Sequence, residues 1–170
     1  MTDSVTVRIA TLEDLPRLHP VIERAYRGDS ARQGWTHEAD LLSGERIDNA
    51  SLTAMMADPA QILLIAEQGD AAVGCVSLTA RGDGLVYLGL LCVDPTRQAG
   101  GIGKVIIAAA EKVSRDQLDA DRIEMTVIDR RAELIAYYER RGFVRTGERR
   151  PFPVAVVPPL SMVVLDKAIS

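Results

Sequence analysis

The chain has 170 residues, of which 47% are hydrophobic and 26% are charged. These values are ordinary for a soluble globular protein, and we expect residues 1–170 to form a single domain. The formal net charge of −4 argues against a dedicated nucleic-acid-binding protein, which normally carries a basic excess. The sequence lacks an apolar segment of the roughly 18 residues that a membrane span needs and the apolar region of a signal peptide. We therefore expect a cytoplasmic protein with no membrane partner.

The two cysteines, Cys75 and Cys92, both lie in apolar segments of strand length and are not part of a C-x-x-C pattern. Reduced thiols in the core of a cytoplasmic protein fit this arrangement. We therefore expect neither a disulfide nor a metal site.

In the first half of the chain, the spacing of apolar residues predicts a strand, two helices and a hairpin. Residues 5–9 alternate as a strand does, and an amphipathic helix follows them. Pro20 removes an interior hydrogen bond of that helix, which predicts a late start or a kink near His19. The other elements expected in this half are a helix over 49–57 and a hairpin of strands 62–66 and 73–78.

The second half of the chain is predicted to continue the sheet. Residues 85–93 form a nearly continuous apolar run, which is typical of a strand buried on both faces. Apolar residues then recur at helical spacing from Ile102 to Val113, and 122–128 alternates as a further strand. Strand, helix and strand make a right-handed crossover, so the two strands should be parallel. The last expected elements are a helix from Ala132 and two strands, 144–148 and 162–165.

A glycine-rich turn within residues 93–104 joins the buried strand to the following helix. The first N–H groups of a helix lack intrahelical partners, and the helix dipole favours an anion there, so the turn suits a phosphate. A Walker A loop is excluded because Gln98 and Val105 replace its first glycine and its hydroxyl residue. A dinucleotide fingerprint is excluded because Ile106 replaces its last glycine. A turn that serves only tight packing of strand against helix stays possible.

The turn instead matches the pattern Q-x-x-G-x-G, from Gln98 to Gly103, after a V-D-P strand exit. This pattern resembles the acetyl-CoA pyrophosphate loop of the GCN5-related N-acetyltransferase (GNAT) superfamily. The resemblance implies acetyl-CoA as acetyl donor, and a backbone N–H near Cys92 or Val93 that stabilises the thioester carbonyl oxygen. The cofactor-binding residues that it implies are Leu91, Cys92, Val93, Gln98, Ala99, Gly100, Gly101, Ile102, Gly103 and Lys104.

A second motif lies within residues 132–143, which read L-I-A-Y-Y-E-R-R-G-F from Leu134 onward. This segment resembles the motif L-[IA]-x-x-Y-E-[KR]-x-G-F of the same superfamily. By that resemblance Tyr138 is the catalytic acid that protonates the departing CoA thiolate, and Tyr137 lies one residue away from that position. The chain departs from the superfamily at Arg131, where Asn is frequent. A tyrosine on an apolar helix face also fits a simple core residue.

The irregular segment 26–46 contains the only tryptophan and one of the two histidines. In the GNAT superfamily, the connection between the first two helices commonly forms one wall of the acceptor site. The resemblance therefore implies substrate contacts for Tyr26, Trp35 and His37, with Arg46 as a further candidate. A surface loop pinned by a packed tryptophan is an equally good interpretation of the same residues.

The general base is not assigned by the sequence. Glu124 and His37 are candidates, and each also fits a structural or solvated role. A basic cluster near the C-terminal end is most simply a solvated face, and in a second interpretation one of its members meets the 3′-phosphate of CoA. The cluster consists of Arg140, Arg141, Arg145, Arg149 and Arg150.

The resemblance implies the GNAT acyl-CoA N-acyltransferase fold. This is an α/β (α+β) protein with a mixed central sheet of about six to seven strands flanked by about four helices. The implied function is transfer of the acetyl group of acetyl-CoA to a primary amine of a small molecule or peptide by direct attack. We expect no nucleic-acid partner, and a homodimer is possible. A non-catalytic acetyl-CoA sensor or regulatory protein of the same fold is the alternative, and the fold does not specify the acceptor.

Overall fold

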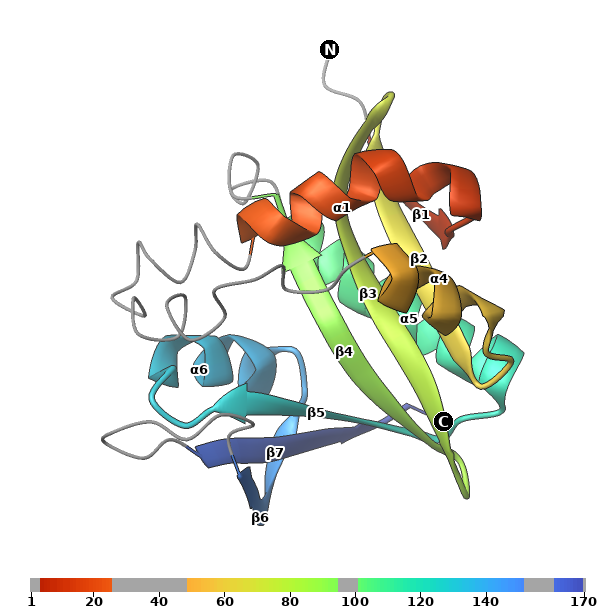
Figure 1. The fold of residues 1–170 in the computed structure, drawn as a ribbon. Coiled ribbons are helices and arrows are strands. Elements are labelled where there is room, and N and C mark those ends of the chain that lie inside the picture. Colours follow the sequence, from red (N-terminus) through yellow and green to blue (C-terminus); the bar gives the residue numbers. More distant parts are fainter. Residues whose placement is uncertain (1–3, 26–48, 95–100, 152–160, 170) are drawn as a thin grey trace.

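The structure is a computed structural model, and it describes residues 4–25, 49–94, 101–151 and 161–169. Within these residues, seven strands form one sheet in the order β1-β2-β3-β4-β5-β7-β6 (Figure 1). The strands are β1 (Val5–Ile9), β2 (Gln61–Gln68), β3 (Ala71–Gly82), β4 (Leu85–Val93), β5 (Arg122–Ile128), β6 (Val144–Pro151) and β7 (Ser161–Ala168).

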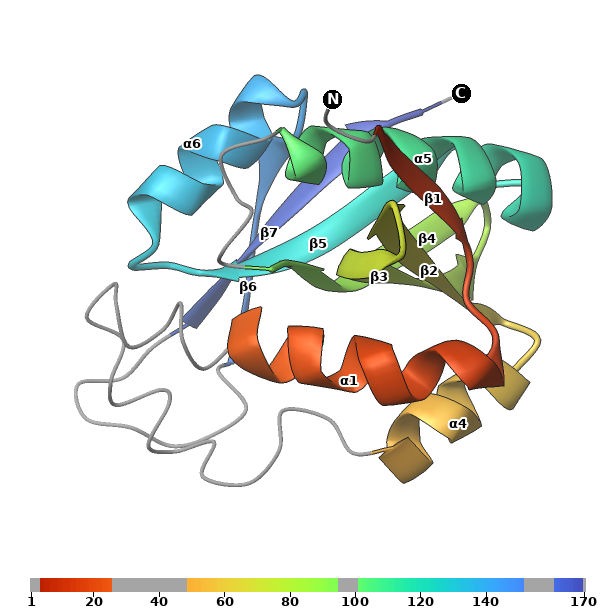
Figure 2. The same ribbon diagram turned by 90° about the horizontal axis from the view of Figure 1, so that it is seen from above.

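Helices cover both faces of this sheet. Figure 2 shows α1 and α4 on one face and α5 and α6 on the other. The predicted fold class, a mixed sheet flanked by about four helices, is thereby confirmed. None of the helices in the described ranges is long and apolar enough to cross a membrane. The helices are α1 (Leu15–Glu23), α4 (Asn49–Ala57), α5 (Ile102–Leu118) and α6 (Ala132–Arg140), and a 3₁₀ turn, η1 (Leu12–Asp14), precedes α1.

The strands β4 and β5 form the parallel pair of the sheet, as the crossover through α5 predicts. The pairing is short, since it runs only from Leu85 opposite Arg122 to Tyr87 opposite Glu124. Beyond these residues the two strands diverge, which Figure 1 shows as a widening angle between them. The sheet is therefore opened between the second half of β4 and the second half of β5.

A β-bulge lies in the second half of β4, at the start of this opening. The register with β3 passes from Gly89 opposite Ser77 to Cys92 opposite Cys75, and Leu90 has a φ of 49°, in the left-handed region. An extra residue in one strand moves the side chains that follow it to the other face of the sheet. Accordingly Leu88 packs in the core beneath α5, whereas Leu90 and Cys92 pack in the core beneath α1.

Several strands are longer than predicted; β3, for example, continues to Gly82 and β7 to Ala168. The helix α1 begins at Leu15 and continues through Pro20, so of the two predicted outcomes the late start is wrong. Leu18 and Ile22 are fully buried, and their burial outweighs the hydrogen bond that proline removes. The strand β6 continues to Pro151, because Arg149 and Arg150 pair with β7 instead of opening the connection.

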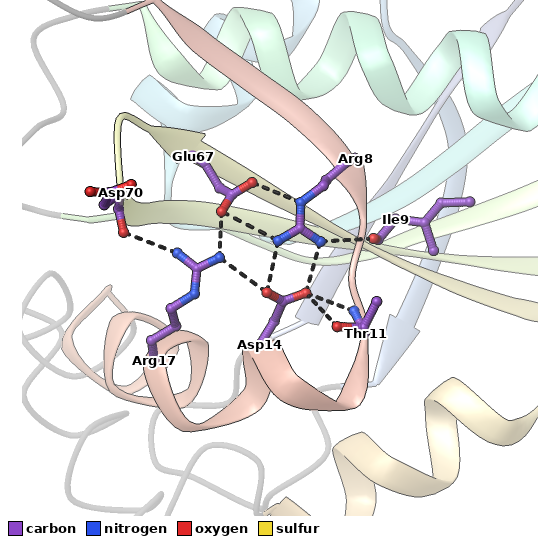
Figure 3. Close-up of polar contacts among 7 residues, drawn as sticks. All are labelled: Arg8, Ile9, Thr11, Asp14, Arg17, Glu67 and Asp70. Carbon is purple, nitrogen blue, oxygen red and sulfur yellow. Dashed lines mark hydrogen bonds and ion pairs between the residues drawn. The ribbon is translucent and has the colours of Figure 1, made fainter.

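An ion-pair network joins β1, η1, α1 and β2 (Figure 3). The buried carboxylate of Asp14 accepts two hydrogen bonds from the guanidinium of Arg8, at 2.8 and 2.9 Å, and one from the backbone N–H of Thr11 at 2.7 Å. Arg17 donates to Asp14 and also to Glu67, which pairs with Arg8 as well. These contacts fix the N-terminal end of α1 against the sheet.

Candidate functional site

The N-terminus of α5 lies beside the open end of β4 and carries the described half of the glycine turn. Gly101 is the N-cap, with a φ of 72° and no side-chain hydrogen bond to the helix. A Cβ built on Gly101 would meet no atom of the described residues within 4 Å. The first N–H groups of this 17-residue helix receive no side-chain cap from Gly101, an arrangement that suits a phosphate.

The predicted cofactor-binding residues divide into two groups. Gly101, Ile102, Gly103 and Lys104 form the first turn of α5, where Ile102 is buried and Lys104 is exposed. The residues Leu91, Cys92 and Val93 follow the bulge at the end of β4. The others, Gln98, Ala99 and Gly100, lie outside the described residues.

The exit of β4 is anchored by Asp94. Its backbone N–H donates to the carbonyl of Val73 at 2.7 Å. Its side chain is only 8% exposed, and the carboxylate accepts from Arg24 at 2.9 Å. Arg24 follows the last residue of α1. The contact therefore ties the end of α1 to the point where β4 leads into the glycine turn.

Tyr137 brings α6 into contact with the first turn of α5. A Cβ built on Gly103 would lie 2.8 Å from the Tyr137 hydroxyl oxygen and 4.0 Å from a methyl group of Val93. The three residues therefore meet where β4 ends and α5 begins. The sequence motif placed Tyr137 one residue from the expected catalytic position. The spacing of apolar residues in this helix does not predict that Tyr137 contacts the glycine turn.

Tyr138, the predicted catalytic acid, is the next residue of α6 and is only 7% exposed. Its ring makes edge contacts with Tyr137 and Phe143, with centroids 5.5 and 6.1 Å away. Burial is the main cause that raises the pKa of the phenol above its ordinary value, Tyr137 raises it further, and the charge of Arg131 acts in the opposite direction. The hydroxyl is thus held in its neutral form, which is the form that can donate a proton.

Glu124, one of the two candidate bases, is held in an ion pair. Its carboxylate oxygens accept from the guanidinium of Arg150 at 3.1 and 3.2 Å, and Arg150 also pairs with Glu148 at 2.8 Å. Because Arg150 donates to both carboxylate oxygens, Glu124 fits a structural role in the sheet better than the role of general base. The sequence does not bring these residues together, since Arg150 reaches Glu124 from β6.

A pair of hydroxyl groups joins β4 and β5 at the end of their pairing, between Tyr87 of the last pair and Thr126, two residues beyond it on β5. The hydroxyl of Tyr87 lies 2.8 Å from the hydroxyl of Thr126, and the guanidinium of Arg81 lies 5.1 Å from the centre of the Tyr87 ring. The contact closes the narrow end of the opening between the two strands. Sequence reasoning missed it, because neither residue belongs to a motif.

The predicted acceptor residues Tyr26, Trp35 and His37, together with Arg46, lie outside the described residues. In the parts of the chain that the structure describes, no group of three or more histidine, cysteine or acidic side chains could hold a metal ion.

A mixed sheet that opens between two parallel strands, with a glycine-capped helix beside the opening, defines the class of acyl-CoA N-acyltransferases. A comparison with family models assigns the particular family. The model described as acetyltransferase (GNAT) domain matches residues 29–162, and the chain belongs to this family.

Solved structures show the same fold over nearly the whole chain. The PaiA N-acetyltransferase from Thermoplasma acidophilum, determined in complex with coenzyme A, has a TM-score of 0.77 at 17% identity over 97% of this chain and 99% of that one. The ribosomal-protein-S18-alanine N-acetyltransferase from Escherichia coli has a TM-score of 0.75 at 15% identity, over 98% and 95%. At these identities the likeness concerns the fold.

A curated relative matches a shorter segment. The mycothiol acetyltransferase of Salinispora tropica is 44% identical over 62 residues, which are 36% of this chain and 20% of the relative. The match thus spans about one fifth of that protein.

Proposed function

We propose that this chain transfers the acetyl group of acetyl-CoA to a primary amine of a small-molecule or peptide acceptor in the cytoplasm. Family membership supports the chemistry. The observation that carries the proposal is the N-terminus of α5, where Gly101 leaves the first N–H groups without a side-chain cap, beside the open end of β4. The match to part of a mycothiol acetyltransferase supports acetyl transfer and leaves the acceptor open.

The residues present fit acetyl-CoA, which supplies an activated thioester and a thiolate leaving group when bound. The free N–H groups of the first turn of α5 donate to phosphate oxygens, and the positive end of the helix dipole adds to the attraction. Gly101 has no side chain that could obstruct a phosphate, and a Cβ at this position would meet no atom of the described residues. The end of β4, at Cys92 and Val93, supplies a backbone N–H for the carbonyl oxygen.

Tyr138 is the proposed proton donor. Its phenol is neutral and can give its proton to the thiolate, which is otherwise released with a full negative charge. Burial raises the pKa of this phenol and makes it a weaker acid than a free phenol. The replacement Tyr138→Phe keeps the ring and its edge contacts and removes only the hydroxyl. The variant should lower kcat by about 10²-fold with little change in acetyl-CoA affinity, and unchanged turnover would remove Tyr138 from this role.

The cofactor site is tested first, by thermal shift with acetyl-CoA, CoA and ATP. A ligand that binds only the folded state raises the apparent stability, so both CoA species should raise Tm and ATP should raise it less. In Gly101→Glu this shift should disappear, because the new carboxylate repels phosphate. Gly147→Glu is the matched control, since Gly147 also has a positive φ and open space around it but lies in β6.

The catalytic activity is tested by release of free CoA over a panel of diamines, amino acids and peptides with free N-termini. Turnover with at least one amine class is the expected result. Binding of acetyl-CoA without turnover on any amine would contradict the proposed enzyme and favour a sensor of the same fold. The acceptor residues Tyr26, Trp35 and His37 are then tested on the best amine by alanine replacement, which should raise KM for the amine and leave acetyl-CoA affinity unchanged.

A further inference from the structure

The arginine cluster near the C-terminal end separates into two kinds of residue. Three of its five members pair with carboxylates of the described residues. These pairs are Arg145 with Glu139 at 3.7 Å, Arg149 with Asp129 at 3.3 Å, and Arg150 with Glu124 and Glu148 at 3.1 and 2.8 Å. The remaining members, Arg140 and Arg141, make no ion pair with any described residue.

Arg141 differs from Arg140 in where its guanidinium lies. The central carbon of the Arg141 guanidinium is 5.2 Å from the centre of the Tyr137 ring, within the range of a cation–π contact. Arg141 is partly buried, whereas Arg140 is exposed on the last turn of α6. An aromatic ring that holds an arginine side chain in one place lowers the entropy lost when the guanidinium binds a ligand.

The ring that holds Arg141 also touches the proposed cofactor turn. The Tyr137 hydroxyl lies against Gly103 in the first turn of α5, and Figure 2 shows the last turn of α6 close to the first turn of α5. Tyr137 therefore contacts the glycine turn through its hydroxyl group and the Arg141 guanidinium through its ring. An unpaired guanidinium is thus held beside the place where phosphates are expected.

We infer that Arg141, held by the Tyr137 ring, binds the 3′-phosphate of CoA and so makes the chain selective for CoA over 3′-dephospho-CoA. The inference rests on the proposed function. Neutral backbone N–H groups suffice for the diphosphate, as at other helix N-termini. A phosphate monoester carries up to two negative charges near neutral pH, and a guanidinium meets it with parallel hydrogen bonds.

The test compares the affinities of CoA and 3′-dephospho-CoA by isothermal titration calorimetry, which requires no turnover. The wild-type chain should prefer CoA by roughly tenfold to a hundredfold, the range of a charge-assisted hydrogen bond. Arg141→Gln should weaken CoA binding by that factor and leave the affinity for 3′-dephospho-CoA unchanged. Arg141→Lys should retain part of the preference, since the charge remains and the planar fork is lost.

Arg140→Gln is the matched control, because it removes the same charge one residue away. It should keep the wild-type preference. The fold should withstand the change at position 141, since Lys167 binds the backbone carbonyl of Arg141 and not its side chain. A second variant, Tyr137→Leu, removes the ring that holds the guanidinium and should reduce the preference without abolishing the binding of either ligand.

Three results would overturn the inference and leave the proposed function in place. In each of them Arg141→Gln keeps the wild-type preference: both affinities fall equally, or neither affinity changes, or neither changes and Lys104→Gln loses the preference instead. Failure of the proposed cofactor site looks different, because the wild-type chain would then bind neither CoA nor 3′-dephospho-CoA. Failure of acetyl transfer alone would appear as CoA binding without turnover on any amine.

Discussion

The Sγ atoms of Cys75 and Cys92 lie 3.4 Å apart, on residues that face each other across β3 and β4. Both side chains are buried, and both thiols are free, as the sequence predicts. The bulge at Leu90 creates this contact, because it moves Cys92 onto the side of the sheet where Cys75 lies. The pair therefore marks the change of face that occurs just before the candidate site.

The cysteine pair should be unreactive in the folded protein. The contact with Cys92, and then burial, raise the pKa of the Cys75 thiol, so little of the reactive thiolate forms at mildly alkaline pH. A chromogenic thiol reagent should label neither cysteine in buffer and both in denaturant. Rapid labelling of one thiol in the native protein would contradict the described burial.

The contact between Gly103 and Tyr137 predicts a reversal of sign in a double-mutant cycle. Gly103→Ala places a methyl group 2.8 Å from the Tyr137 hydroxyl, and such overpacking should lower the free energy of unfolding by about 1 kcal/mol. In the background of Tyr137→Phe the nearest ring atom is the Cζ at 3.7 Å, an ordinary contact. There the same alanine should be neutral or stabilising, because alanine favours a helix over glycine.

Denaturant unfolding of the four proteins measures this coupling. Equal effects of the alanine in both backgrounds would show that the Tyr137 hydroxyl does not reach the turn.

Tyr138 should make stability depend on alkaline pH. Its pKa is raised in the folded protein above the ordinary value of 10, so the folded state holds the phenolic proton more tightly than the unfolded state does. The stability linked to this proton is complete below about pH 10 and is lost as the pH rises further. Tyr138→Phe should therefore lose less stability than wild type between neutral pH and about pH 11.

The matched control for this pH series is Tyr87→Phe, whose phenol is only partly buried. It should follow the wild-type pH dependence more closely than Tyr138→Phe does. Ultraviolet difference spectra give a second reading, since the Tyr138 phenol should ionise only at a pH above that of free tyrosine.

Asp14 should make stability depend on acid. Hydrogen bonds from Arg8, ahead of those from Thr11 and Arg17, hold the pKa of this carboxyl well below its ordinary value of 3.8. The stability that it adds is therefore present above pH 3.8 and is lost as the pH falls below that value. Asp14→Asn should cost about 2–4 kcal/mol near neutral pH, because a buried carboxylate that serves several donors is removed.

Glu13→Gln provides the comparison for Asp14→Asn, because Glu13 is an exposed acid in the same turn. It should change the free energy of unfolding by no more than about 0.5 kcal/mol. If Asp14→Asn is as stable as Glu13→Gln, the network of Figure 3 adds nothing to stability.

Local sequence patterns predicted most of the elements. The run of apolar residues that became β4, the alternation of β5 and the first residue of α5 were located correctly, because burial on one or both faces dictates these periods. The apolar spacing ended at Val113, whereas α5 continues to Leu118. Residues 93–104 likewise indicated a glycine turn before a helix, since a positive φ at Gly101 favours glycine.

The candidate site was only partly predictable. The bulge at Leu90 changes which face of the sheet the following side chains occupy. The nearly continuous apolar run of residues 85–93 does not predict this bulge. The alternation of residues 122–128 predicts that Glu124 lies in a strand. It does not predict the ion pair with Arg150, because Arg150 lies 26 residues further along the chain. The motif directed attention to Tyr138, whereas contact with the glycine turn belongs to Tyr137.

Sequence by itself therefore determined the class of fold, the glycine turn and the segment that carries the two tyrosines. Each of these depends on neighbouring residues, whose burial and backbone preferences act along the chain. Tertiary structure decided which face of the sheet Cys92 joins, which carboxylates the arginines neutralise, and that the Arg141 guanidinium lies over the Tyr137 ring. These outcomes depend on side chains that meet only when separate strands and helices pack, because charge pairing and van der Waals contact act over a few ångströms in space and not along the sequence.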